Sequence, residues 1–386
     1  MLFRSAAVRH GGRMVMVGIL PTLRAEELRL AALSDTARFR ALNIGIRRLR
    51  QEPFRIRIDG ADPLELAADD IGLEGANTSF QVHLKVDPER FASHFNAAQL
   101  AIGPVLAVAG NSPTFLGHRL WEGTRVALFK QALDDRDAAG RSSRRICRVA
   151  FGTGWIATGA MELLEESVRL HEPVLPVLSA ECPLERVAAG QVPTLEELRL
   201  HQSTVWRWNR AIYDPAGGGH LRIEARPCPP GRRWSTCWPT PPSCSASPWP
   251  WPPTPMPGCA RSRSGKPTTT STAPPSSASA PSWPGHSARR PDADGPGAPA
   301  DPRLLPVARH GLEKAGVEPE EVDELLAVIE ARAAAGQTGA VWQRQTLAAL
   351  EPQLGREQGL AATFERYLEL QGTNVPVHTW PVPGRR

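Results

Sequence analysis

The chain has 386 residues, enough for one large domain or two ordinary ones with a sizeable core. Its formal charge of +5 comes from Pro227 to Ala300, where seven Arg and Lys stand against two Asp, while the other residues balance at 38 basic and 38 acidic. The basic composition is therefore no indication of a nucleic-acid surface, and we expect no nucleic-acid partner.

The cysteines and the N-terminal residues argue against two further classes of protein, those that bind zinc and those that are secreted or span a membrane. Four of the six cysteines lie in the same segment, and no C-x-x-C pair occurs, which argues against a zinc site. The opening residues lack the apolar core of a secretory signal, and no apolar run approaches the length that spans a bilayer. We therefore expect a cytoplasmic protein without a membrane partner.

The first elements in chain order are strands and one helical stretch. Arg13–Ile19, RMVMVGI, is a predicted buried strand, and a helical pattern follows over Leu23–Arg50. Phe54–Gly60, FRIRIDG, alternates apolar and polar residues and ends in a turn, which indicates a strand. In Ser79–Val86 the alternation predicts one face with Ser79, Gln81, His83 and Lys85 and another with Phe80, Val82, Leu84 and Val86.

Helices dominate the rest of the chain. The pattern from Pro88 to about Ala109 predicts a helix, and Leu120–Leu133 predicts another. The stretch EPEEVDELLAVIEARAAAG predicts a helix that opens with Pro and acidic residues and closes on Gly336, and a helix-rich run extends from Gly339 to Leu370. We expect an α+β fold, with an antiparallel sheet and packed helices.

The segment from Pro227 to Ala300 has a composition that a packed domain would not use. It contains no Leu, Ile, Val, Phe, Tyr, Glu, Asn or Gln, yet it holds five Trp, at positions 234, 238, 249, 251 and 283. Disordered linkers also lack large aliphatic residues, but they usually keep Glu and Gln and avoid Trp. We predict that the segment is disordered, and one interpretation is a Pro-rich linker or interaction segment.

A second interpretation, which we favour, is that the segment is translated out of frame. Combining the last base of each codon with the first two bases of the next converts Cys237-Trp238 to Leu and Trp238-Pro239 to Ala. The run Thr268–Thr272 becomes compatible with Asp-Asn-Asn-Phe-Tyr. Read in this way the segment predicts an Ala/Leu/Val helix, with the original frame regained before Leu304.

Five stretches on the two sides of this segment carry a resemblance to a known family. In an order and spacing that extend over nearly the whole chain, they are VGILPTLR (Val17–Arg24), EGANTSFQVHLKV (Glu74–Val86), GNSPTFLGHRLWEGTRVALF (Gly110–Phe129), VWRWNRAIYD (Val205–Asp214) and HLRIEAR (His220–Arg226). They resemble the bacterial glutamate–cysteine ligase family of the second type, the carboxylate–amine ligases. The resemblance implies a glutamine-synthetase-like domain that normally includes an earlier strand with a Glu-x-Glu-like pair, and we expect those carboxylates to be missing here.

The activity implied by the resemblance is amide formation driven by ATP. The γ-carboxylate of glutamate attacks the γ-phosphate to form an acyl phosphate, and cysteine or another amine then displaces phosphate. Such a site needs oxygen ligands for Mg²⁺, cations for phosphate charge and a pocket that orients the carboxylate. The resemblance assigns Glu224, His83 and Glu74 to the metal, Arg226 and Arg222 to catalysis, and Gln81, His83 and Trp206 to the nucleotide.

The residue pattern of the strand His220–Arg226 is compatible with this chemistry. Arg222, Glu224 and Arg226 are spaced two residues apart and project on one face, so a carboxylate able to bind a metal lies between two guanidinium groups able to bind phosphate. A surface ladder of cross-strand ion pairs explains the same pattern. His83 likewise shares a face with Gln81, although a lone His on a strand is usually hydrogen-bonded or solvated.

Four further residues are expected to contact the substrate. Asn111 and Ser112 precede a proline in a turn that suits the amino-acid end of a substrate, and a helix-terminating turn explains them almost equally well. Arg125 and Arg207 would hold a carboxylate or cover the substrate. The Gly-rich Asp214–His220 lacks the Gly-Lys-Ser/Thr ending of a P-loop and indicates a turn between strands.

We therefore expect a catalytic domain over residues 1–226, a disordered segment over 227–300, and a helical C-terminal part of the same domain over 301–386. The frame change would replace roughly a dozen buried aliphatic residues worth about 1.5–3 kcal/mol each, which exceeds a typical stability of about 5–15 kcal/mol. We expect impaired ligase activity for this reason. An inactive product of a degraded gene and a Pro-rich interaction protein are the alternatives.

Overall fold

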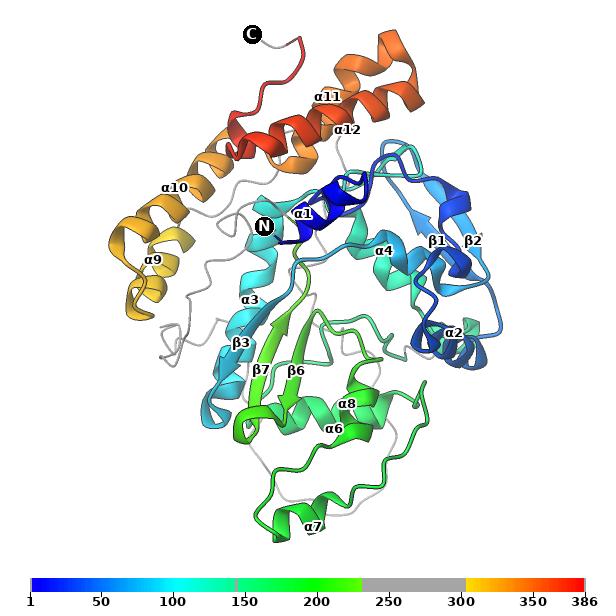
Figure 1. Cartoon of the computed structure of the whole chain (residues 1–386), viewed down its shortest axis with the longest axis vertical. Helices are drawn as coiled ribbons and strands as arrows, with labels where there is room; N and C mark the ends of the chain where they lie inside the picture. Colours follow the sequence, from blue (N-terminus) through cyan, green and yellow to red (C-terminus); the bar gives the residue numbers. More distant parts are fainter. Residues whose placement is uncertain (1, 143–144, 231–302, 385–386) are drawn as a thin grey trace, which may run out of the picture.

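The computed structural model describes residues 2–142, 145–230 and 303–384. Over these ranges the chain is a mixed α/β structure with small antiparallel sheets, which confirms the predicted fold class at this coarse level. Figure 1 shows a three-stranded sheet near the middle, a second pair of strands to one side, and the C-terminal helices above them. The frame change and the disorder predicted for 227–300 fall, from residue 231 onward, outside the described residues.

The three-stranded sheet carries three of the predicted site residues, His83, Arg222 and Glu224. Its order is β3–β7–β6, with β3 at Val82–Val86, β7 at His220–Ala225 and β6 at Asn209–Asp214. A Gly-rich turn joins β6 to β7, as predicted, and its three glycines, 217 to 219, have φ between 62° and 88°. Residues with a Cβ rarely adopt such angles, so glycine is required for this tight connection.

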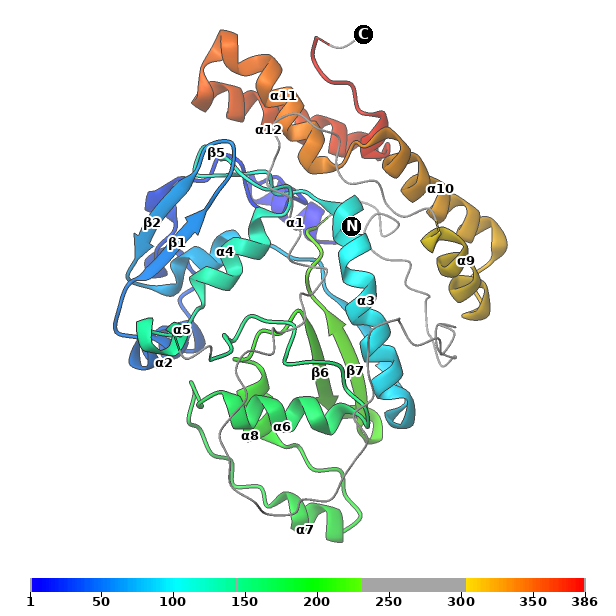
Figure 2. The same cartoon turned by 180° about the vertical axis from the view of Figure 1, so that it is seen from behind.

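One face of this sheet is apolar, and two helices cover it. Val82 and Val86 of β3 are buried while His83 and Lys85 are exposed, which confirms the predicted alternation. Figure 2, seen from behind, shows α3 (Phe91–Ala109) and α6 (Ala160–Leu170) in front of the sheet. The core that joins them consists of Val86, Phe91, Phe95, Ala98, Ile156, Ala160, Leu163, Ala211 and Ile223. The charged side chains of the three strands therefore lie on the opposite face.

A second sheet, β1 (Phe54–Ile58) with β2 (Leu64–Ala68), forms beside the first. In β1 the buried Phe54, Ile56 and Ile58 alternate with exposed arginines, as FRIRIDG predicts. The helix α4 (Thr124–Ala132) packs on this pair through Ala127 and Leu128. This part of the fold carries α4 and its Arg125 toward the end of β7.

The remaining elements before residue 230 are short. They are α1 (Leu2–Arg9), α2 (Ala37–Leu49), the hairpin β4 (Thr114–Phe115) and β5 (His118–Arg119), α5 (Ala138–Ser142), α7 (Pro183–Ala188), α8 (Glu196–Gln202), and five 3-10 turns at Ala25–Glu27, Leu30–Ala32, Ile71–Ala76, Pro88–Arg90 and Ala216–Gly218. The helical pattern predicted over Leu23–Arg50 is thus interrupted. Its only α-helix, α2, begins after Thr36, whose hydroxyl accepts a hydrogen bond from the N–H of Phe39 as an N-cap.

Four helices form the C-terminal part: α9 (Leu304–Lys314), α10 (Pro319–Ala335), α11 (Gly339–Leu354) and α12 (Arg356–Thr373), followed by a 3-10 turn at Val377–Thr379. The helix α10 begins with proline and ends at Gly336, which has φ 61°, as predicted. The backbone N–H of Ala340 donates to the carbonyl of Gly110 at 2.9 Å, so α11 is attached directly to the end of α3.

The prediction of a strand at Arg13–Ile19 is wrong. The segment is extended but pairs with no strand among the described residues. Side chains of α12 bind its backbone instead: Gln371 accepts from the N–H of Met16 at 2.7 Å, and the hydroxyl of Tyr367 donates to the carbonyl of Met16 at 2.8 Å. The predicted burial is confirmed for Val17, Gly18 and Ile19, whereas Met14 is exposed. The partner of the segment is a helix nearly the whole chain away.

The expectation that no apolar run is long enough to span a bilayer is also wrong by the criteria of length and composition. The run Pro88–Ala109, which includes α3, has 22 residues and meets both criteria. In this fold Phe91, Phe95 and Ile102 of the helix are buried in protein cores, so its apolar character serves packing here.

Candidate functional site

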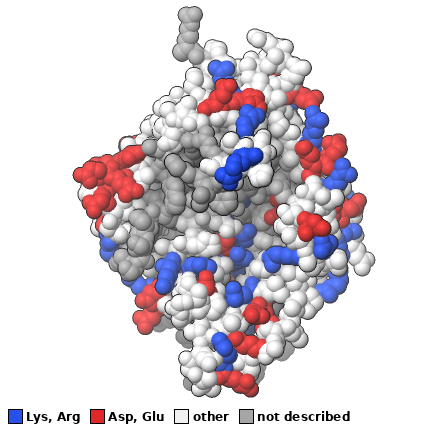
Figure 3. Space-filling model, in the orientation of Figure 1, with Lys and Arg blue, Asp and Glu red and all other residues white. Residues whose placement is uncertain are grey.

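The polar face of the three-stranded sheet carries a row of three ionisable side chains. The strand register places His83 of β3 and Arg210 of β6 opposite Glu224 of β7, one on each side. Figure 3 shows Lys and Arg side chains gathered on the face of the molecule that lies over these strands. The candidate site is centred on Glu224 because β7 is the middle strand.

The carboxylate of Glu224 is buried and held by Arg210. Its side chain is 2 % exposed, and its Oε2 accepts a hydrogen bond from Nε of Arg210 at 2.7 Å. The other oxygen, Oε1, lies 3.7 Å from Nε2 of His83 and 3.9 Å from Nε of Arg226. The cross-strand ion pair of the alternative interpretation is thus present at Glu224, but it is buried and not at the surface.

Arg226 is the second buried charge of the cluster. Its backbone N–H donates to the carbonyl of Trp208 at 3.0 Å, and its guanidinium lies over the ring of Phe129 at 5.9 Å. Burial, reinforced by the charge of Arg210, lowers the pKa of Arg226 to about 10, so the group remains a cation at neutral pH. Its Nε and Nη1 atoms have no hydrogen-bond partner among the described residues. A desolvated cation with free donors is suited to bind an oxyanion.

Glu74 and His83 face this cation from two other elements. Burial raises the pKa of Glu74, which lies in the 3-10 turn before β3, and the charge of Arg226 opposes that shift. Burial also lowers the pKa of His83, as do the charges of Arg222, Arg210 and Arg226, whereas Glu224 opposes the shift. Glu74, His83 and Glu224 thus all lie within the electrostatic reach of Arg226.

The cluster does not have the composition of a magnesium site. In the part of the chain that the structure describes, no three His, Cys, Asp or Glu side chains converge. One oxygen of Glu224 is engaged by Arg210, and the other faces His83 and Arg226. Mg²⁺ needs several oxygen ligands, and two guanidinium groups beside the one central carboxylate oppose a divalent cation. These residues fit an oxyanion better than a metal ion.

Arg222 and Gln81 lie at the margin of the site. Arg222 is two residues before Glu224 on the same face of β7, and its Nη2 pairs with Oδ2 of Asp214 at 3.1 Å. Gln81 is exposed and lies just before β3 begins at Val82. The structure shows no contact that joins Gln81 to Glu224.

Asn111 and Ser112 lie in a buried junction between distant parts of the chain. The amide nitrogen of Asn111 lies 2.9 Å from the hydroxyl of Tyr367, and its oxygen accepts from Nε2 of Gln343 at 2.9 Å. Ser112 is fully buried and its hydroxyl lies 3.4 Å from the carbonyl of Glu122. Both predicted substrate contacts are thus engaged within the fold, which leaves their proposed role in binding without support from the geometry.

The other predicted contacts are buried arginines and a tryptophan. Arg125 donates from Nη1 to the carbonyl of Pro227 at 2.6 Å, and burial lowers its pKa to about 10. Arg207 pairs with Oε1 of Glu166 at 2.8 Å, and Trp206 is part of the core around Phe129. The Nε atoms of Arg125 and Arg207 have no hydrogen-bond partner within the described ranges. Arg125 lies next to the Arg226 cation, whereas Arg207 belongs to a separate ion pair.

One residue that holds the site together, Arg210, was missed by the sequence predictions. It stands in the stretch VWRWNRAIYD, but no pattern within that stretch distinguishes Arg210 from Arg207. The signal becomes visible only when β6 is aligned with β7 across the Gly-rich turn, which places Arg210 opposite Glu224. Charged residues at equal distances from a tight turn are candidates for such a pair.

No protein-family model, no curated protein and no solved structure matches this chain.

Proposed function

We propose that the chain is built on the glutamine-synthetase-like catalytic domain of an ATP-dependent carboxylate–amine ligase of the glutamate–cysteine type. The observation that carries the proposal is the pair of Glu224 on the middle strand and the largely buried Arg226 just after it, whose Nε and Nη1 have no hydrogen-bond partner among the described residues. ATP with Mg²⁺ is the proposed phosphoryl donor, and glutamate with cysteine or another amine are the proposed substrates.

The chemical role that we propose for these residues is the binding of a reacting oxyanion. Two donors of Arg226 would bind the carboxylate of the substrate and then the acyl phosphate formed from it. Arg226 is anchored for this task by its backbone hydrogen bond to Trp208 and by the ring of Phe129. A cation fixed in advance in a dry site stabilises developing negative charge without reorganisation. Glu224 and Arg210 would fix the position of this cation.

We further propose that activity is impaired in the chain as it stands. The anomalous composition begins at Pro227, directly after Arg226. The first residues of the segment are packed against the site: Arg125 donates to the carbonyl of Pro227, and the N–H of Phe80 donates to the carbonyl of Cys228 at 2.9 Å. Because the segment begins directly at the site, replacing its residues by those of another reading frame would alter the site.

The test compares two full-length proteins. One is the chain as printed, and the other carries residues 227–300 read in the alternative frame together with any open frame upstream of Met1. Phosphate release from ATP is measured with Mg²⁺, glutamate and cysteine, and with each amino acid omitted. We expect background release from the printed chain and release that depends on both amino acids from the re-read chain.

Arg226→Gln in the re-read chain is the matched test of the site, and Arg169→Gln, at an exposed position on α6, is its control. Loss of activity in the first variant alone supports the proposed role of Arg226. Background release from the re-read chain would overturn the ligase proposal. Release from the printed chain would overturn only the proposed impairment.

A further inference from the structure

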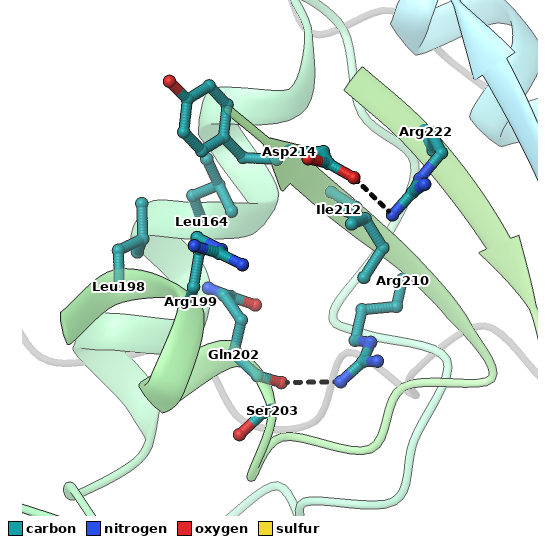
Figure 4. Close-up of a pocket in the computed structure, with 11 residues that line it drawn as sticks. Leu164, Leu198, Arg199, Gln202, Ser203, Arg210, Ile212, Asp214 and Arg222 are labelled. Atoms are coloured by element: carbon teal, nitrogen blue, oxygen red, sulfur yellow. Dashed lines mark hydrogen bonds and ion pairs between the residues drawn. The ribbon is translucent and has the colours of Figure 1, made fainter. Parts of the chain in front are cut away.

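A pocket at the margin of the candidate site lies between α8 and the strands β6 and β7, and Arg222 of the predicted residue set is part of its lining. Its volume is about 170 Å³. This corresponds to the space of about five or six waters in the liquid, so a small organic molecule would fit. Figure 4 shows Arg199 and Gln202 on the helix side of the pocket, with Arg210 and Arg222 opposite on the strands. With Leu164 of α6, the pocket combines residues of four elements.

The amide of Gln202 is the polar group in the pocket that most needs a partner. The residue is 7 % exposed, and its Nε2 has no hydrogen-bond partner within the described part of the chain. Its backbone carbonyl is engaged, because it accepts from Nη1 of Arg210 at 3.1 Å. Leaving a buried amide donor unpaired is unfavourable, so a ligand that accepts a hydrogen bond from Nε2 would stabilise the folded protein.

The charges around the pocket leave one cation uncompensated. Arg210 is paired with Glu224, and Arg222 is paired with Asp214. The side chain of Arg199 makes no hydrogen bond or ion pair among the described residues. The pKa of Asp214 is lowered by the hydrogen bond from Ala216 and by the charges of Arg222 and His220, and the charge of Arg199 makes a smaller contribution. The net charge of one positive unit matches a carboxylate, whereas a phosphate dianion would leave an excess of negative charge.

The lining also contains aliphatic side chains, together with Ser203 and Tyr213. Leu164, Leu198 and Ile212 border the pocket beside these polar groups. The Nε atom of Arg222 is also a buried donor without a partner in the described ranges. We propose that this pocket binds a small carboxylate with a short aliphatic chain, the carboxylate meeting Arg199, Gln202 and Arg222 and the chain meeting the three aliphatic residues. The proposal does not depend on ligase activity, since it concerns binding alone.

The test uses the full-length protein and measures the melting temperature with 20 mM sodium butyrate, butyramide or sodium phosphate at matched ionic strength. A ligand that binds only the folded state raises the melting temperature. We expect butyrate to raise it by about 2 °C, and butyramide, which has the same shape without the charge, to have no effect. Arg199→Gln and Gln202→Leu should each abolish the shift, and Arg169→Gln on the exposed surface of α6 should retain it.

Three results would overturn the proposal. Butyrate without effect on the unaltered protein would show that the pocket takes no such ligand. An equal shift in all variants would place the binding elsewhere on the protein. A larger shift with phosphate than with butyrate, lost in Arg199→Gln, would overturn the assignment to a carboxylate. Melting temperatures of the variants without additive show whether each substitution itself changes the fold.

Discussion

Arg210 and Glu224 face each other across β6 and β7 and share a hydrogen bond of 2.7 Å between Nε and Oε2. The carboxylate is 2 % exposed and the guanidinium 15 %. Taking both charges out of water is expensive, and their attraction offsets this cost only while both remain. Each of the two charges therefore depends on the other for its stability in the fold. We expect substitutions of this pair to have the largest effect on stability within the candidate site.

We expect Glu224→Gln to destabilise the protein by about 3 kcal/mol, because the substitution leaves Arg210 and Arg226 as buried cations without their common counter-charge. The measurement is the free energy of unfolding in urea. The matched control is Glu365→Gln, whose partner Arg13 lies 2.6 Å away on an exposed surface. A much smaller change is expected there, since exposed pairs contribute little. Equal losses of unfolding free energy in the two variants would contradict the mutual dependence of Arg210 and Glu224.

Local patterns predicted the strands of the site well. The alternation in Ser79–Val86 and in His220–Arg226 placed His83 and Glu224 on the polar face, and the structure has them opposite each other. A period of two residues assigns faces because successive side chains point in opposite directions. The same patterns could not show which strands pair, so Arg210 was not identified.

The junction around Asn111 shows where local patterns fail. Its partners Met16, Gln343 and Tyr367 come from both ends of the chain. The turn GNSPTF is equally compatible with a substrate contact and with a structural junction, because the deciding contacts lie 95 to 256 residues away. The same cause made Arg13–Ile19 a false strand: its apolar pattern is real, but side chains of α12 satisfy its backbone.

Asn111→Ala should destabilise the protein by about 2–4 kcal/mol, because it leaves Gln343 and the carbonyl of Met16 with fewer partners inside a buried junction. Tyr367→Phe, which removes one hydroxyl from the same network, should cost less. Because the two side chains contact each other, the double variant should lose less than the sum of the two single losses. Urea unfolding of the four proteins measures this coupling, and simple additivity would contradict the network.

Two helical glycines offer a matched comparison of packing. A Cβ at Gly45 of α2 would lie 2.4 Å from the carbonyl oxygen of Val174, whereas a Cβ at Gly103 of α3 would meet nothing within 4 Å. We expect Gly45→Ala to lower the free energy of unfolding by about 1–3 kcal/mol, since backbone cannot retreat as a flexible side chain does. Gly103→Ala should instead raise it by up to about 1 kcal/mol, because alanine favours the helix. A loss of stability in Gly103→Ala would contradict the open surroundings of that position.

The buried ring of His171 should make stability depend on pH. Burial lowers the pKa of His171 to about 3 from an ordinary value of 6.5, and the charges of Arg148, Arg207, His201 and Arg145 act in the same direction. The unfolded chain therefore binds a proton that the folded chain does not, at any pH between these two values. The stabilisation is fully present above pH 6.5 and is lost as the pH falls toward 3, by up to about 1.4 kcal/mol per pH unit.

Urea unfolding at pH 7, 5.5 and 4.5 measures this dependence. Carboxylates titrate in part of the same range, for example Asp62, whose pKa is held below its usual value by hydrogen bonds from Arg119 and Arg356. The difference between the unaltered protein and His171→Gln removes their contribution, because both proteins contain the same carboxylates. We expect the variant to lose less stability between pH 7 and 4.5 than the unaltered protein does. His10→Gln, at an exposed position, is the control and should lose as much stability between pH 7 and 4.5 as the unaltered protein does. An equal loss in His171→Gln would show that the ring of His171 is not held neutral by its surroundings.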